Sequence, residues 1–310
     1  MINAKMLRQA LPFLSLAVVL VATFIIQPRT MSYFGLNLML QYAVPIALAT
    51  IAQMFVITCN DLDLSIGPFV GLVSCIGATL LLDNPVMGVL ALVALILVYA
   101  AVGGLIQTRS LPSIVVTLGL AFIWLGIAVL ILPSPGGKAP QWLKSLMALQ
   151  TPIVPFPIIA AVVIGLLIQF ALMKTSLGVI ARGAGGNPVA LTRAGWSMFR
   201  TKAIMFGIAG FFGVLSGLSL LGLTTSGDAH IADRYTLYSI AGVILGGGEF
   251  IGGRVSPMGA VIGALTLALA GSFLIFLRIS PDWQIGAQGA ILIIVLALRA
   301  LVTQAGKVTA

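Results

Sequence analysis

The chain alternates long apolar segments with short breaks made of proline, glycine and single charged residues. A helix needs about 20 apolar residues to cross a bilayer, and most of these segments approach that length. The pattern predicts ten helices, over 11–27, 36–58, 66–82, 86–106, 113–132, 153–172, 203–223, 235–246, 256–277 and 285–301. We therefore expect an all-α polytopic membrane protein whose residues 1–310 form one transmembrane domain.

The composition supports this fold class. Hydrophobic residues make up 60% of the chain, charged residues 7%, and the mean hydropathy is +1.18. Soluble domains carry about 25% charged residues, so the composition excludes a water-soluble enzyme, a disordered protein and a disulfide scaffold. The net charge of +9 comes from basic residues that stand singly between apolar segments. This spacing indicates contact with membrane lipid and not with nucleic acid.

The positions of lysine and arginine predict the orientation of the helices. With the N-terminus inside, 11 basic residues fall in inner loops and 5 in outer loops. Because basic residues concentrate on the cytoplasmic side, we expect both termini in the cytoplasm.

Two loops in this arrangement are long enough for a role of their own. The outer loop, about 133–155, suits an extracytoplasmic partner. The inner loop, about 174–202, has five basic residues and no acid, and its Asn187-Pro188 pair predicts the start of a short helix. Such a helix on the cytoplasmic face is typical of a docking element.

The chemistry of an enzyme or a nucleotide site is missing from the sequence. His230 is the only histidine, so we expect no metal site. Gly136-Gly137-Lys138 resembles the end of a P-loop but lacks the hydroxyl residue and the first glycine. We therefore expect no cofactor in this chain and no ATP hydrolysis by it, and energy must come from a partner or from an ion gradient.

Two acids, Asp61 and Asp63, stand where helices could bury them. An uncompensated acid at the bilayer centre costs about 2.5–3.5 kcal/mol on the insertion scale. Two acids so close in sequence should therefore lie at a helix end or in a re-entrant turn. Helix capping is one role that fits them, and coupling to protons or cations is another.

Five segments between about residues 40 and 300 carry sequence motifs. They are Asp-Leu-Ser-Ile-Gly at 63–67; Leu111-Pro112 with Thr117, Leu118, Gly119 and Gly126; Thr175, Gly178, Gly185, Gly186, Asn187, Pro188, Ala190 and Gly195; Gly246, Gly247, Gly252, Gly253 and Arg254; and Gly259 with Gly263. In order and spacing these segments resemble the membrane permeases of bacterial ABC importers for monosaccharides, the ribose/xylose/arabinose type.

This resemblance implies the type II ABC importer permease fold in the bacterial inner membrane. It also implies three partners: an ATPase subunit that binds ATP and Mg, a periplasmic sugar-binding protein, and a second permease subunit in a homodimer or heterodimer. The inner loop would hold a coupling helix that seats in the ATPase subunit, with Gly183, Gly185, Gly186, Asn187, Pro188, Ala190, Arg193 and Gly195. The remaining implied sites are a turn with Asn60, Asp61, Asp63 and Ser65, and an inner glycine loop with Gly246, Gly247, Glu249, Gly252, Gly253 and Arg254.

The chain also departs from the family pattern. Asn60-Asp61 stands where the family has two glycines, and these residue types are the non-glycine residues that most readily adopt left-handed backbone angles. The segment Thr236-Leu237-Tyr238-Ser239-Ile240 lacks both acids of the family's Glu-Leu-Asp-Ala-Ile, and Leu125 replaces an arginine. These departures leave the solute and the symmetry of the dimer open.

We expect the permease subunit of an ATP-driven importer for a small polar solute, a monosaccharide or a related sugar. Polar residues on apolar helices are candidates for its path, although each also fits an interhelical hydrogen bond: Gln41, Gln53, Thr58, Asn60 and Thr117. One alternative is an ion-coupled secondary transporter that uses Asp61 and Asp63. Another is an intramembrane scaffold or membrane enzyme without solute flux.

Overall fold

The computed structural model describes residues 4–280, with side chains from residue 10 onward, and the separate positions 283, 286, 287, 289, 290, 293 and 297. Within these residues the secondary structure is helical, apart from an isolated bridge between Gly136 and Gly227. Seven segments of the described chain are long and apolar enough to span a membrane: Tyr33–Thr58, Ile66–Asp83, Pro85–Thr108, Ser113–Ile131, Phe156–Lys174, Met198–Thr224 and Pro257–Phe276.

The predicted helices between residues 11 and 277 all have counterparts. The helices are α1 (Ala4–Ile26), α2 (Tyr33–Leu40), α3 (Ala43–Thr58), α4 (Ile66–Ala78), α5 (Leu80–Asp83), α6 (Pro85–Thr108), α7 (Ser113–Ile131), α8 (Gln141–Met147), α9 (Phe156–Lys174), α10 (Ser176–Gly186), α11 (Pro188–Arg193), α12 (Met198–Thr224), α13 (Tyr235–Leu245) and α14 (Pro257–Phe276). The tenth predicted helix, 285–301, lies outside the continuously described residues.

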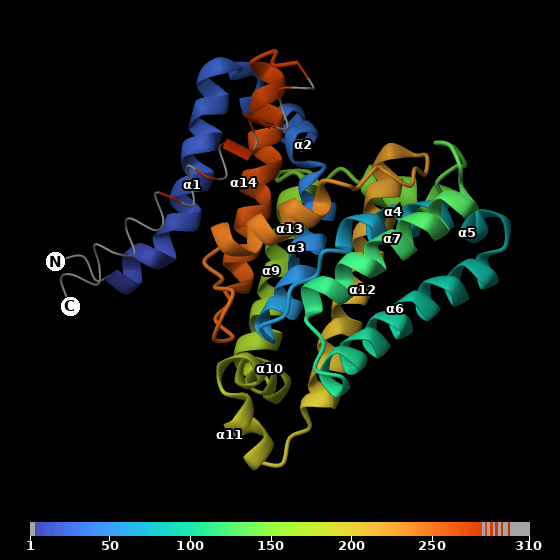
Figure 1. Ribbon diagram of the computed structural model, residues 1–310. Coiled ribbons are helices and arrows are strands. Elements are labelled where there is room, and N and C mark those ends of the chain that lie inside the picture. Colours follow the sequence, from blue (N-terminus) through green and yellow to red (C-terminus); the bar gives the residue numbers. More distant parts are fainter. Residues whose placement is uncertain are drawn as a thin grey trace.

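The predicted helix over 36–58 is interrupted between α2 and α3, at Gln41 and Tyr42. Pro45 explains the break, because its ring nitrogen cannot donate to the carbonyl group four residues earlier. Beyond the break, α3 is buried along its whole length and packs against α12, α13 and α14. It is the central helix of the bundle (Figure 1).

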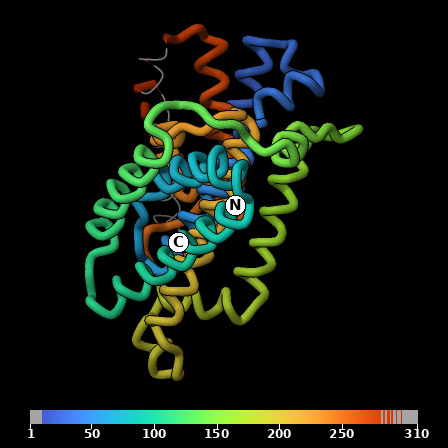
Figure 2. The backbone as a smooth tube through the Cα atoms, turned by 90° about the vertical axis from the view of Figure 1, so that its right-hand side faces the viewer, coloured from blue at the N-terminus to red at the C-terminus, as the bar shows by residue number. Residues whose placement is uncertain are grey.

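The loops gather at two opposite ends of the bundle. At one end, α10 and α11 stand off below the other helices (Figures 1 and 2). At the other end, the segment 133–155 crosses the bundle, where the Lys138 N–H donates to the Ala78 carbonyl at 3.1 Å and the Thr151 N–H to the Tyr33 hydroxyl at 3.0 Å. The inner loop and the outer loop that the sequence predicted thus lie at opposite ends of the bundle. We call these two ends the α11 end and the opposite end.

Close backbone contact between helices depends on the small residues that the sequence singled out. A Cβ atom added at Gly217 would lie 2.6 Å from Cβ of Val73 in α4, and one at Gly259 or Gly263 would overlap the backbone of α13 and the residue after it. Because lipid gives helices no hydrophobic drive to associate, such close packing stabilises the bundle. These glycines therefore pack α12 against α4 and α14 against α13.

Candidate functional site

Three of the sequence motifs meet at the α11 end. The turn 60–65 joins α3 to α4, the helices α10 and α11 form the predicted coupling region, and the glycine loop 246–254 joins α13 to α14. These segments are far apart in sequence, and the structure brings them into hydrogen-bonding contact at Asn60. We call this place the three-way junction.

Asn60 joins all three segments through one side chain. Its amide nitrogen donates to the Gly185 carbonyl of α10 at 2.6 Å, and its amide oxygen accepts from the Gly252 N–H at 3.0 Å. Its backbone has φ of +61°, the left-handed region that asparagine adopts more readily than most residues. The side chain can reach both partners because the backbone turns here.

Glycine at position 185 allows α10 to touch α3 directly. A Cβ atom there would overlap the Thr58 carbonyl oxygen and lie 2.9 Å from Cα of Gly253. Gly253, with φ of +63°, is pressed in turn against the Arg182 carbonyl oxygen. The junction is therefore packed backbone against backbone, so that α10 cannot shift without moving its two neighbours.

The carboxylate of Asp61 pairs with Lys202 at the start of α12. The Lys202 Nζ and Asp61 Oδ2 atoms are 2.8 Å apart, and the two side chains are 13% and 8% exposed. Little solvent remains to screen this pair, so the loss of either partner leaves a nearly buried charge. The pair attaches the 60–65 turn to α12.

Asp63 is enclosed within the bundle. Its Oδ1 atom accepts hydrogen bonds from the N–H and hydroxyl of Ser65, both at 2.7 Å, and its Oδ2 atom accepts from the Tyr99 hydroxyl at 2.8 Å. Gln53, in the amide orientation that satisfies both of its ends, bonds the Asp63 backbone at 3.0 and 3.1 Å. Asp63 thus lies in the turn between the ends of α3 and α4, and side chains from α3 and α6 hold it there.

Three of the candidate path residues, Thr58, Thr117 and Gln53, form hydrogen bonds within the bundle. Thr117 of α7 accepts from the Leu64 N–H at 3.1 Å, as Ser113 does from Leu62, and Thr58 bonds the Met54 carbonyl of its own helix. With Gln53, these residues hold the turn and its neighbouring helices. Gln41 is half-buried at the α2–α3 break, at the other end of α3 from this junction.

The short helix α11 is the exposed part of this region. Asn187 caps it by accepting from the Ala190 N–H at 2.9 Å, as the Asn187-Pro188 pair predicted, and none of its residues is buried. Val189 is 59% exposed. Gly195 then turns the chain with φ of +86° toward α12. An apolar, basic helix held away from the bundle is suited to contact with another protein.

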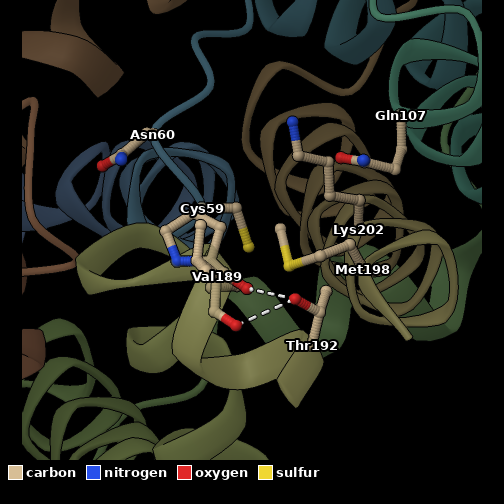
Figure 3. Close-up of a pocket in the computed structure, with 9 residues that line it drawn as sticks. Cys59, Asn60, Gln107, Val189, Thr192, Met198 and Lys202 are labelled. Carbon is tan, nitrogen blue, oxygen red and sulfur yellow. Dashed lines mark hydrogen bonds between the residues drawn. The ribbon is translucent and has the colours of Figure 1, made fainter. Parts of the chain in front are cut away.

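A cavity of about 390 Å³ separates α11 from the turn and from α12. In Figure 3, Val189 and Thr192 lie in the lower part of the view, Lys202, Met198 and Gln107 at the right, and Asn60 at the upper left. The cavity opens to the surface, so it gives α11 room to move against the bundle.

The glycine loop closes on itself beside the junction. The Glu249 N–H donates to the Arg254 carbonyl at 2.9 Å, and the two side chains form an exposed ion pair at 3.4 Å. Gly246 packs on the backbone of Gly259 in α14, while Gly247 adopts φ of +98°. The loop thereby ties α13 and α14 to Asn60.

Sequence reasoning did not identify Lys202, Tyr99 or Ser113 as members of this region. Lys202 counted only as one of several basic loop residues, and the other two lie in ordinary apolar segments. Their roles depend on which helices are neighbours, which the pattern of a single helix does not show. Among the described residues, no three His, Cys, Asp or Glu side chains gather to hold a metal ion.

The sequence is similar to those of known transport proteins. The chain is 28% identical over 277 residues to the probable ABC transporter permease protein YphD of Escherichia coli K12, covering 86% of this chain and 81% of that protein. It is 26% identical to the ribose import permease protein RbsC of Bacillus subtilis 168, covering 93% and 91%, and 27% identical to the galactose/methyl galactoside import permease protein MglC of Escherichia coli K12, covering 91% of each. No solved structure matches the chain.

A family profile covers the same part of the chain that holds the motifs. Residues 35–296 match the family described as the permease component of branched-chain amino acid transport systems. The match includes the three-way junction and every spanning helix from α3 to α14. The chain therefore belongs to this family of membrane transport permeases.

Proposed function

We propose that this chain is the transmembrane subunit of an ABC importer that moves a small neutral sugar across the bacterial inner membrane. The names of the similar proteins support the class, since they are a probable ABC transporter permease and permeases for ribose and galactose import. The observation that carries the mechanism is the contact of Asn60 with both α10 and the glycine loop.

The proposed partner at the α11 end is an ATPase subunit, which binds the ATP and Mg. When the two ATPase subunits close, they push on α11. The backbone contacts at Gly185 and the hydrogen bonds of Asn60 pass this movement to α3 and to the glycine loop. Packed interfaces switch between discrete arrangements instead of deforming continuously, so the push can change which end of the path is open.

The remaining parts of the proposal concern orientation and assembly. The α11 end faces the cytoplasm, in keeping with the five basic residues of the 174–202 loop, and ten membrane helices leave both termini on that side. A periplasmic sugar-binding protein docks at the opposite end. A second permease subunit, identical or different, completes the path, and the chain itself binds no cofactor and has no enzymatic activity.

The similar proteins are named for two different classes of solute. The family description names branched-chain amino acids, whereas the relatives matched over about nine-tenths of the chain are named for ribose and galactose import. We favour a sugar, because relatives aligned over about nine-tenths of their own length are closer evidence than a family label.

An ion-coupled transporter would need a carboxylate free to bind a proton or cation within the membrane. Asp61 is paired with Lys202, and both oxygens of Asp63 accept hydrogen bonds. These contacts favour the role of helix and turn anchors for both acids, and therefore the ATP-driven importer.

Co-purification tests the proposal. The permease is expressed with the proposed ATPase subunit, and the complex is isolated through a tag on the ATPase. Val189→Glu places a charge on the exposed face of α11 and should prevent co-purification. Trp142→Glu, a matched change at an exposed aromatic of the opposite end, should leave it intact. Equal recovery of the ATPase with both variants would refute α11 as the docking helix.

A further inference from the structure

A second cavity lies at the opposite end of the bundle, and its volume is about 750 Å³. We propose that this cavity is the vestibule that receives the solute, and that Tyr42, Tyr235 and Tyr238 hold the ring of a neutral sugar there. The inference rests on the proposed function and adds to it a site and a chemical basis for the choice of solute. The volume falls within the roughly 300–1,000 Å³ of ordinary small-molecule sites.

The course of the chain creates this space. Because α13 has only 11 residues, it is about 16 Å long and reaches roughly halfway through a bilayer core of about 30 Å. The segment 225–234, between α12 and α13, descends beside α4, where the Ala229 and Ala232 carbonyls lie against Gly71 and Gly67. Non-helical backbone at membrane depth is tolerated where it is buried in protein or lines a water-filled cavity.

Three tyrosines lie around this cavity. Tyr235 is 7% exposed, and its ring centroid is 6.4 Å from that of Tyr238, with an angle of 37° between the planes. Tyr42 comes from the α2–α3 break. The face of an aromatic ring is electron-rich, so it attracts the weakly positive C–H groups on the face of a sugar ring, while the phenol groups can bond sugar hydroxyls.

Two hydroxyl groups stand on the walls among the apolar residues. The Thr224 hydroxyl donates to the Leu220 carbonyl at 3.0 Å, and the Ser272 hydroxyl lies 3.4 Å from the Met39 carbonyl. A hydroxyl that donates its proton keeps lone pairs to accept another hydrogen bond. Such a wall suits a solute that presents several O–H donors.

The charges around the cavity argue against a charged solute. His230, Asp233 and Arg234 are all exposed, and Asp233 already pairs with His230 at 3.1 Å. The deeper lining residues, from α3, α12, α13 and α14, are uncharged. A zwitterionic amino acid would enter this part with two unpaired charges, which is costly in a site of low polarity. A neutral sugar carries no such cost.

Saturation-transfer NMR on the full chain in lipid nanodiscs tests the site. The probes are D-ribose, D-galactose, D-xylose and L-leucine, each at millimolar concentration. We expect transfer to the ring C–H protons of at least one sugar, and none to leucine. Tyr42→Ala should weaken this binding at least about fivefold, an effect of about 1 kcal/mol, and Tyr42→Phe should restore it. Phe122→Ala, an exposed aromatic of α7 outside the cavity, is the matched control and should bind as the unmodified chain does.

Several results would overturn the vestibule: no transfer to any sugar, transfer to leucine alone, or sugar binding that Tyr42→Ala leaves unchanged. Tyr42→Leu keeps apolar volume without a ring and replaces the alanine variant if that variant melts at a lower temperature. Uptake by the complete importer separates the two proposals. Sugar uptake that persists after a failed binding test contradicts only the vestibule, whereas leucine uptake without sugar uptake contradicts the proposed function as well.

Discussion

Asn60 shows how a single residue can serve two purposes, because its backbone makes the turn and its amide joins two other segments. The sequence indicated the first purpose, since asparagine replaces glycine in a motif that needs a left-handed turn. It could not indicate the second. The two partner groups are backbone atoms 125 and 192 residues away, and no side-chain pattern marks them.

Two substitutions at position 60 separate these purposes. Asn60→Gly keeps the left-handed backbone and loses two hydrogen bonds, which should cost about 1–3 kcal/mol. Asn60→Ala loses the same bonds and adds about 1–2 kcal/mol of backbone strain. Thermal unfolding of the purified chain should therefore rank the unmodified chain above Asn60→Gly, and Asn60→Ala lowest. Equal stability of all three would mean that the amide contacts contribute nothing.

The Asp61–Lys202 pair gives a prediction about charge. Asp61→Asn or Lys202→Gln alone leaves one nearly buried charge without a partner, with an expected cost of about 3–5 kcal/mol. The double variant removes both charges and should recover most of that stability.

Uptake by the double variant also separates the two transport mechanisms. We expect it to keep ATP-driven uptake, because the pair is structural. Complete loss of uptake, with stability restored, would instead assign Asp61 to ion coupling.

At the scale of helices, each apolar segment predicted as a helix between residues 11 and 277 is helical in the structure. The Asn187-Pro188 pair likewise predicted the start of α11. It did not predict the break at Gln41 and Tyr42, because the apolar pattern continues across it. Nor did the pattern show that α3 lies at the centre of the bundle. Because lipid is as apolar as the neighbouring helices, a buried helix and a lipid-facing helix can have similar apolar patterns.

The contact between α10 and α3 can be tested with two glycines of one helix. Gly185→Ala places a methyl group against the Thr58 carbonyl and should lower ATP-driven uptake at least about tenfold, which corresponds to about 1.4 kcal/mol. At Gly183 the nearest atom to an added Cβ is the flexible end of Leu191, at 3.3 Å. Gly183→Ala should therefore transport normally. Similar rates for the two variants would show that this contact does not couple α10 to the bundle.

At the scale of the whole molecule, the basic residues predicted which loops lie together, and the structure separates those loops at two ends. The sequence did not show the three-way junction as one unit, because it forms only when the helices from α3 to α14 are assembled. It also gave no sign of the tyrosine-lined cavity. Its residues come from five separate segments, and each tyrosine alone reads as an ordinary membrane residue.

Cysteine labelling in intact cells tests the proposed orientation. Val189→Cys on α11 should react with a membrane-impermeant maleimide only after the cells are opened, and Trp142→Cys should react from outside. Both positions are more than half exposed. The native cysteines give little background, because both are buried, and burial together with the nearby Asp61 carboxylate raises the pKa of Cys59 to about 12. Reaction of Val189→Cys in intact cells would reverse the orientation.

Reconstituted transport tests most directly the claim that an ATPase partner, and not an ion gradient, drives this permease. Proteoliposomes containing this chain alone, supplied with proton and sodium gradients and radiolabelled D-ribose, D-galactose or D-xylose, should accumulate no sugar and hydrolyse no ATP. Vesicles that also contain the proposed ATPase and binding protein should accumulate one of these sugars when ATP is present on the α11 side. Gradient-driven accumulation by the chain alone would contradict a permease that is moved by its partner.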